Sequence, residues 1–209
     1  MTVKTYNSNE LRQNIYLYYD EQSREGMLID AGCSPADITA LTAAIKESSI
    51  TVKAILLTHG HFDHITAADE MRNLTGAAVY CHEAEEPMLK DPALNLAVRF
   101  NSTIAVTPDM LLNDGDVLQF GNIELTVLHI PGHTLGGVCY YDKNNGNLFS
   151  GDVLFKKSVG RTDLPNGNTA ALIDGIKTKL LSLPGSTRVY PGHGPGTTIG
   201  HEVEYNPFI

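Results

Sequence analysis

Metal-ligating side chains are concentrated in residues 59–64, where His59, His61, Asp63 and His64 follow the pattern H-x-H-x-D-H. Residues two apart in an extended segment point to the same side, so His59 and His61 can face one cation, and Asp63 continues the alternation. A catalytic tetrahedral zinc site takes three protein ligands and a water molecule. The surplus of ligands therefore favours a site for two divalent ions.

Three further candidate ligands, His133, Asp152 and His193, follow apolar runs at distant points of the chain. A glycine immediately precedes each of them, where the chain must turn sharply. Ligand sites in α/β sheets gather beyond the carboxyl ends of the strands. We therefore expect five histidines and two aspartates to converge at one edge, with the two oxygens of Asp152 suited to bridging two ions.

Short apolar runs rich in β-branched residues, bounded by turn-forming residues, predict strands along the whole chain. The predicted strands are residues 15–19, 27–29, 52–57, 77–80, 123–130, 138–141, 148–149 and 188–190. Helical spacing of apolar residues predicts helices near residues 35–45, 65–74, 83–90, 93–100 and 169–181. Several strands are apolar on both faces, as in sheets that are covered on both sides. These elements predict a layered α/β sandwich.

Composition excludes several classes of protein. The chain has 209 residues and a formal net charge of −9, whereas binding to a phosphate backbone requires a basic surface, so we expect no nucleic-acid partner. No apolar run approaches the roughly 20 residues that span a membrane, and the first residues lack the apolar core of a signal peptide. Three scattered cysteines are too few for a disulfide framework. We expect a cytoplasmic protein with no membrane partner.

The motifs resemble those of the metallo-β-lactamase superfamily. The resemblance rests on Thr58–His64, Pro131–Thr134, Ser150–Asp152 and Pro191–Pro195, and it covers nearly the full chain. It implies a single domain over residues 1–209, a four-layer αββα sandwich with a dinuclear metal site at one edge. The ligands that it implies are His59, His61 and His133 for the first ion, Asp63, His64 and His193 for the second, and Asp152 for both.

The resemblance implies two divalent ions, with zinc as the first expectation and iron or manganese compatible with the same ligands. It also makes Asp63 the candidate catalytic residue, which would orient a hydroxide. Asp30 matches a family position that supports the site without binding metal. The remaining histidines, His82, His129 and His201, are expected at helix-end, core and surface positions, outside the site.

Within the superfamily, the segments Gly160–Pro165 and Glu202–Phe208 are similar to those of the short glyoxalase II-like proteins. These proteins resemble hydroxyacylglutathione hydrolase but lack its additional C-terminal helical domain, which supplies part of the glutathione site. The similarity implies hydrolysis of a small acyl thioester such as lactoylglutathione. The planar guanidinium of Arg161 suits a substrate carboxylate, although Asp163 could instead hold it in an ion pair.

Two other functions stay open on the sequence alone. One is a persulfide dioxygenase with a single iron, for which His59, His133 and Asp152 could form the facial triad. The other is a non-catalytic metal-binding module. A single-iron oxygenase does not need the second group of ligands, and a degenerate binder would be expected to have lost some, so the complete set favours a hydrolase. A β-lactamase is not expected, because the resemblance then implies a cysteine in place of Asp152.

Overall fold

Two six-stranded mixed sheets form the centre of the molecule, of which the computed structural model describes residues 1–8 and 12–209. In the first sheet, β1, β2 and β3 pair antiparallel, and β3, β4, β5 and β6 pair in parallel. Helices α1 (Pro35–Glu47) and α3 (Ala68–Thr75) lie in the parallel connections. The strands of this sheet are β1 (Thr2–Asn7), β2 (Asn14–Tyr19), β3 (Glu25–Ile29), β4 (Thr51–Leu56), β5 (Ala78–His82) and β6 (Met110–Leu112).

The second sheet has the order β14-β13-β10-β9-β8-β7, and only β10 and β13 pair in parallel. Helix α5 (Thr169–Gly175) lies in the connection between those two strands. The strands are β7 (Val117–Phe120), β8 (Ile123–His129), β9 (Val138–Asp142), β10 (Asn147–Gly151), β13 (Arg188–Pro191) and β14 (Thr197–Thr198). Short elements complete the chain: α2 (Phe62–Ile65), α4 (Glu86–Lys90), β11 (Leu154–Phe155), β12 (Ser158–Val159) and α6 (Ile199–Tyr205).

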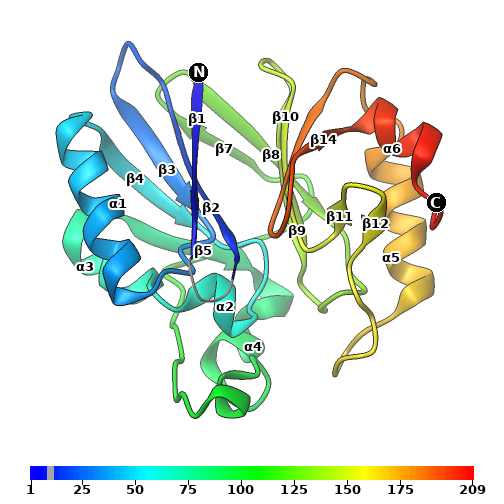
Figure 1. Cartoon of the computed structure of the whole chain (residues 1–209), viewed down its shortest axis with the longest axis horizontal. Coiled ribbons are helices and arrows are strands. Elements are labelled where there is room, and N and C mark those ends of the chain that lie inside the picture. Colours follow the sequence, from blue (N-terminus) through cyan, green and yellow to red (C-terminus); the bar gives the residue numbers. More distant parts are fainter. Residues whose placement is uncertain (9–11) are drawn as a thin grey trace.

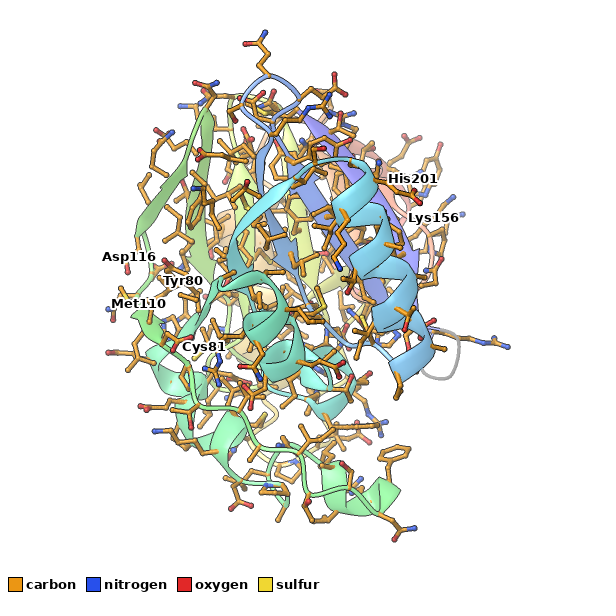
Figure 2. The ribbon with its side chains drawn as sticks, turned by 90° about the vertical axis from the view of Figure 1, so that its left-hand side faces the viewer. Tyr80, Cys81, Met110, Asp116, Lys156 and His201 are labelled. Carbon is orange, nitrogen blue, oxygen red and sulfur yellow. The ribbon has the colours of Figure 1, made fainter. Side chains whose placement is uncertain are left out.

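The sheets and helices form four layers (Figure 1). Helices α1 and α3 cover the outer face of the first sheet, and α5 and α6 lie on the outer side of the second. Figure 2 views the molecule from the side of α1 and α3, with Met110 of the edge strand β6 near Tyr80, its pairing partner on β5. The predicted α/β sandwich of the metallo-β-lactamase type is therefore confirmed.

Both faces of the first sheet are covered at strand β2, where all six residues are buried. Leu17 packs in the cluster beneath α1, whereas Tyr18 packs between the sheets. The ring of Tyr18 lies 5.2 Å from that of Phe149 on the second sheet, a tilted aromatic contact that adds to the area buried. A third apolar cluster lies between the second sheet and α5.

Hydrogen bonds join the two sheets near the ends of their strands. The Val138 amide of β9 donates to the Thr58 carbonyl, 2.9 Å away, just beyond β4. The Tyr140 hydroxyl donates to the Leu57 carbonyl at 2.8 Å. The Tyr16 hydroxyl donates to the Pro191 carbonyl at the end of β13, 2.6 Å away. These bonds connect β2 and the end of β4 in the first sheet to β9 and the end of β13 in the second.

The predicted helix over residues 93–100 is wrong in its first half, because only Ala97–Phe100 forms a single 3-10 turn. The Asn95 side chain accepts a hydrogen bond from the Ala97 amide, and Leu96 adopts a left-handed backbone with φ 72°. This local bond competes with helix formation. The predicted helix near 65–74 corresponds to α3 and begins three residues late, because the separate short helix α2 ends at Ile65. The sequence does not predict the edge strands β1, β6, β7 and β14, whose apolar runs are brief or interrupted by polar residues.

The described part of the chain contains no helix that is both long and apolar enough to cross a membrane. The three cysteines, Cys33, Cys81 and Cys139, are buried and unpaired. Burial raises the pKa of the Cys33 and Cys81 thiols to about 12. They are therefore packing residues and not nucleophiles at neutral pH.

Two glycines with positive φ provide a test of how closely the sheets approach each other. A Cβ added at Gly151 (φ 48°) would lie 2.3 Å from Thr58 Oγ1, whereas one at Gly146 (φ 63°) would meet no atom within 4 Å. We expect Gly146→Ala to lower the free energy of unfolding by about 1–2 kcal/mol, the backbone cost alone. Gly151→Ala adds overpacking and should cost about 2–5 kcal/mol. Urea unfolding of both variants measures this difference. An equal loss of unfolding free energy in the two variants would show that the sheets can move apart at Gly151 and Thr58 without a further loss of stability.

Candidate metal centre

All seven predicted ligands converge beyond the ends of strands from both sheets. Residues 59–64 follow β4 and include the start of α2, which lies below the sheets and above α4 in Figure 1. His133 follows β8, Asp152 follows β10 and His193 follows β13. The prediction that these residues converge is correct, although their role as ligands remains a prediction.

Three histidines form the first group of candidate ligands. A nitrogen from each of His59, His61 and His133 lies within 4.8 Å of those of the other two, and all three residues are buried. His61 Nδ1 lies 3.0 Å from His133 Nε2. The planes of the three rings are nearly perpendicular to one another, at 75–88°. Their nitrogens therefore approach a shared point from different directions, as a tetrahedral site requires.

Asp63, His64 and His193 form the second group, again with ligand atoms within 4.8 Å of one another. His193 Nε2 lies 3.2 Å from Asp63 Oδ2 and 3.3 Å from His64 Nε2. Asp63 lies in the first turn of α2, and its carboxylate is grouped with His64 and His193 and not with His59 and His61. The pattern H-x-H-x-D-H is thus divided between two groups by the start of a helix.

Asp152 lies between the two groups, and its carboxylate is close to both. Oδ1 is 3.5 Å from His64 Nε2, whereas Oδ2 is 3.6 Å from His133 Nε2 and 3.8 Å from His193 Nε2. The side chain is only 14% exposed, and Oδ1 has no hydrogen-bond partner among the described residues. A buried carboxylate oxygen without a partner is costly unless a cation is bound to it.

Four of the histidines are oriented by a hydrogen bond from the ring nitrogen that faces away from the cluster. His64 Nδ1 donates to Asp30 at 2.9 Å, His133 Nδ1 to the Arg161 carbonyl at 2.8 Å, and His193 Nδ1 to the Arg12 carbonyl at 3.2 Å. His59 Nδ1 lies 3.1 Å from the Thr58 hydroxyl. Such contacts fix the tautomer of a metal-binding histidine and leave its other nitrogen free. In agreement, His59 Nε2 is buried and has no partner in the described structure.

Asp30 supports the site and is not itself assigned as a ligand. Although its carboxylate lies near His59 and His64, Oδ1 already accepts from the Thr58 amide and Oδ2 from the Thr58 hydroxyl, both at 2.7 Å. Oδ2 also accepts from His64. The backbone of Asp30 is left-handed, with φ 55°, a conformation that costs energy and is retained where the surroundings determine it.

The charges of the cluster are divided between neutral and charged imidazoles. Burial, together with the neighbouring imidazole of His133, lowers the pKa of His61 to about 3, and burial also holds the pKa of His59 well below its usual value. Burial would lower the pKa of His64 too, but the carboxylates of Asp63, Asp152 and Asp30 outweigh it and raise that pKa to about 10. The first group thus offers free lone pairs, and a cation in the second group must displace a proton from His64.

The Arg161 side chain is held by Asp163 and does not enter the cluster. Its Nε and Nη2 donate to the two Asp163 oxygens, each at 2.7 Å, and the guanidinium side chain is 61% exposed. The main chain of Arg161 has a separate role, since its carbonyl orients His133. The ion-pair alternative is therefore observed, while the substrate-binding role remains a prediction.

A cavity of about 680 Å³ lies beside His193. The other residues that line it include Asn7, Asn14, Gly194 and Arg12. Arg12 is exposed and cationic in an otherwise acidic chain. Sequence reasoning missed it, because it lies in no motif and is far from the ligands along the chain.

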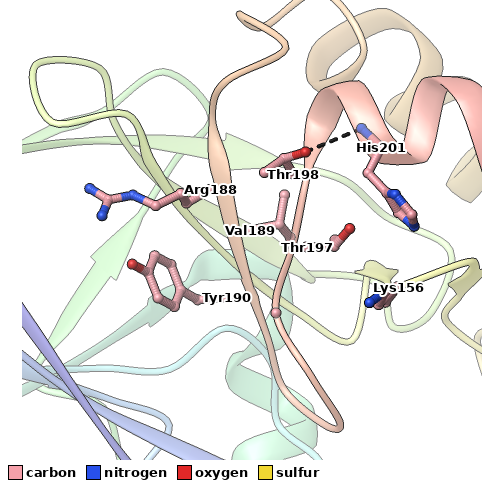
Figure 3. Close-up of a pocket in the computed structure, with 8 residues that line it drawn as sticks. Lys156, Arg188, Val189, Tyr190, Thr197, Thr198 and His201 are labelled. Atoms are coloured by element: carbon pink, nitrogen blue, oxygen red, sulfur yellow. Dashed lines mark hydrogen bonds between the residues drawn. The ribbon is translucent and has the colours of Figure 1, made fainter.

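The other three histidines lie outside the cluster, as predicted. His82 caps the turn after β5 and stacks on His129 at 3.9 Å. His201 lines a separate cavity of about 420 Å³ beside β14, where Figure 3 shows it on the same side as Lys156. Arg188 extends to the opposite side of the strand in Figure 3. The cationic side chains of this cavity therefore do not converge, and we assign no site to it.

Comparison with known proteins agrees with this arrangement. The family model described as the metallo-β-lactamase superfamily matches residues 8–193. The chain is 34% identical to a protein of Haemophilus influenzae named hydroxyacylglutathione hydrolase GloC, over 100% of this chain and 98% of that protein. It is also 44% identical over 167 residues, 79% of each protein, to a Bacillus subtilis protein named probable metallo-hydrolase YqgX.

Two solved structures are similar over almost the whole chain. The structure described as the BLEG-1 B3 metallo-β-lactamase is 41% identical, with a TM-score of 0.93 and 99% of both chains covered. The structure described as TTHA1623 in a di-iron-bound form is 40% identical, with a TM-score of 0.85, and covers 99% of this chain and 100% of that one. The matched family model and the shared four-layer fold lead to the conclusion that this chain belongs to the metallo-β-lactamase superfamily.

Proposed function

We propose that the protein is a metal-dependent hydrolase of small acyl thioesters, with hydroxyacyl-glutathione as the substrate class. The observation that carries the proposal is the position of Asp152, which lies between two groups of three candidate ligands and has its carboxylate close to both. The likeness to the relative named hydroxyacylglutathione hydrolase, which extends over the full chain, supports this choice of substrate.

The seven side chains fit a pair of divalent ions. The first group would hold one ion, the second group would hold the other, and Asp152 would contact both. Zinc suits these imidazole and carboxylate ligands, and iron is an alternative that the di-iron-bound relative supports. When bound, two such ions lower the pKa of water from 15.7 to about 7 and polarise a carbonyl oxygen.

Asp63 is suited to orient the attacking water. Burial alone would raise the pKa of its carboxyl, but His64 and His193 outweigh burial and hold that pKa well below its usual value, so the carboxylate is an acceptor only. Its side chain remains 21% exposed, at the open side of the second group. An ionised acceptor at this position can take a hydrogen bond from water and direct a lone pair to the substrate carbonyl.

Departure of the thiol and binding of the glutathione moiety require few further side chains. The thiol released from a thioester has a pKa near 8.5, so it leaves without a strong general acid. The anionic glutathione moiety needs cationic partners in a chain of net charge −9. The exposed side chains of Arg161 and Arg12 lie near the centre and are the proposed partners.

Hydrolysis of a β-lactam is a second candidate function. The observation in its favour is the 41% identity and the TM-score of 0.93 to the structure described as a B3 metallo-β-lactamase. A β-lactam, like a thioester, presents a carbonyl for attack by water, so the same ligands and Asp63 would serve. The two candidates differ in the leaving group and are separated by direct assay.

Asp152 is expected to be needed by both ions. Asp152→Asn should reduce the content of both metals and lower kcat/KM by about 100-fold or more, because the bridge is lost to each group. Metal analysis of protein purified without added metal measures the first effect. The matched control is Asp142→Asn, a buried aspartate at the far end of β9 that accepts from the Asn145 amide at 2.8 Å. Wild type that is fully active with one ion would refute the dinuclear assignment.

Arg161 is expected to bind substrate and not metal. Arg161→Ala should raise KM about 10-fold with unchanged metal content, because the main-chain carbonyl that orients His133 is kept. Asp163→Asn should leave the guanidinium free for substrate and so leave KM equal or lower. Steady-state kinetics of both variants test this prediction. An unchanged KM in Arg161→Ala would show that the Arg161 side chain serves only the ion pair with Asp163.

Direct assay is expected to show thioester hydrolysis. Purified wild type is incubated separately with lactoylglutathione, with glutathione persulfide in an oxygen electrode, and with a chromogenic cephalosporin. Release of thiol from the first without oxygen uptake is the expected result. Oxygen uptake with persulfide and no thioester cleavage would support a dioxygenase, and turnover of the cephalosporin alone would support a β-lactamase.

A further inference from the structure

Glu85 is a buried carboxylate next to the ligand cluster but outside it. It ends the 3-10 turn Glu83–Glu85 after β5, and it is only 1% exposed. Its neighbours in the same acidic run differ: Glu83 is exposed, and Glu86 pairs with Lys90 at 2.5 Å. No lysine or arginine of the described chain forms an ion pair with Glu85.

The two oxygens of Glu85 accept hydrogen bonds from two different loops. Oε1 accepts from the amide of Gly60 at 2.8 Å, and Gly60 lies between His59 and His61. Oε2 accepts from the amide of Gly136 at 2.6 Å, in the loop that carries His133. One loop follows β4 of the first sheet, and the other connects β8 and β9 of the second. Glu85 therefore connects the two loops that supply the whole first group of ligands.

The approach of both loops to Glu85 is close. A Cβ added at Gly136 would lie 2.5 Å from the main-chain nitrogen of Glu85 and 2.7 Å from its Cβ. A Cβ at Gly60 would lie 3.3 Å from Glu85 Oε1 and 3.1 Å from Met88 Cγ. Glycine at both positions therefore allows the main-chain amides to reach the carboxylate.

We propose that Glu85 is a positioning residue of the metal centre, which holds the amides of Gly60 and Gly136 and thereby fixes His59 and His61 relative to His133. Its effect is on the affinity of the first group for a cation. The inference rests on the metal centre proposed above and is independent of the substrate.

A carboxylate is the side chain that these two donors require. Burial raises the pKa of Glu85 to about 6, and the amides of Gly60 and Gly136 limit that rise, so the group is ionised at neutral pH and offers two acceptors. Glutamine offers one acceptor and places its own N–H groups against the second amide. One buried donor is then left without a partner, a costly arrangement that shifts the loop.

The test compares Glu85→Gln with wild type and with a matched control, Glu202→Gln. Glu202 is also buried and accepts from a main-chain amide, that of Lys157 at 2.7 Å, but it forms no hydrogen bond to either ligand loop. Zinc affinity is measured by competition with a chromophoric chelator, and the geometry of the site by the visible spectrum of the cobalt-loaded protein. We expect Glu85→Gln to weaken zinc binding by about 10- to 100-fold and to change the cobalt spectrum.

Unchanged zinc affinity and cobalt spectrum in folded Glu85→Gln would overturn the inference. An equal loss of affinity in Glu202→Gln would also overturn it, since the effect would then be general destabilisation. Wild type that binds neither zinc nor cobalt would instead refute the metal centre itself. Should Glu85→Gln fail to fold, Glu85→Asp replaces it: this side chain is ionised but too short to reach both amides, so weakened zinc binding supports the inference and wild-type binding overturns it.

Discussion

Five imidazoles and two carboxylates can share one small volume only if the strand ends that carry them are held in a fixed register. The register comes from bonds between the sheets, in particular the Val138 amide to the Thr58 carbonyl and the Tyr140 hydroxyl to the Leu57 carbonyl. Both acceptors immediately precede His59. A shift of one residue would turn the side chains of β4 to the opposite face and move the first ligands away from their partners.

The charges of the clustered carboxylates and imidazoles must also be balanced. The carboxylates of Asp63, Asp152 and Asp30 surround His64 and raise its pKa. When no metal ion is bound, His64 is therefore protonated, and its positive charge offsets part of their negative charge. His59 and His61 remain neutral by burial. The environment alone therefore gives the same type of side chain two different charges. Divalent cations would suit both groups, because they would bind the free lone pairs of the first group and replace the proton of the second.

The convergence of the seven candidate ligands could be predicted from the sequence, because they have a characteristic spacing and follow apolar runs. A layered α/β sandwich could also be predicted, since strands such as residues 15–19 are apolar on both faces, and the resemblance to the family implied its four layers. The contacts behind the ligands could not. Glu85 is one of several glutamates in an acidic run, and only tertiary structure makes it buried. The main-chain carbonyls of Arg12 and Arg161 act regardless of side-chain type, so no residue pattern indicates them.

The order of the ligands along the chain has a consequence for biosynthesis. His59 and His61 emerge from the ribosome early, but His133 completes the first group only after the second sheet has begun to form, and His193 follows β13, which must dock beside β10 in parallel. Pairings between residues so far apart form late, because the loop between them must first be closed. A nascent chain would therefore offer cations only partial sites until β13 has paired with β10.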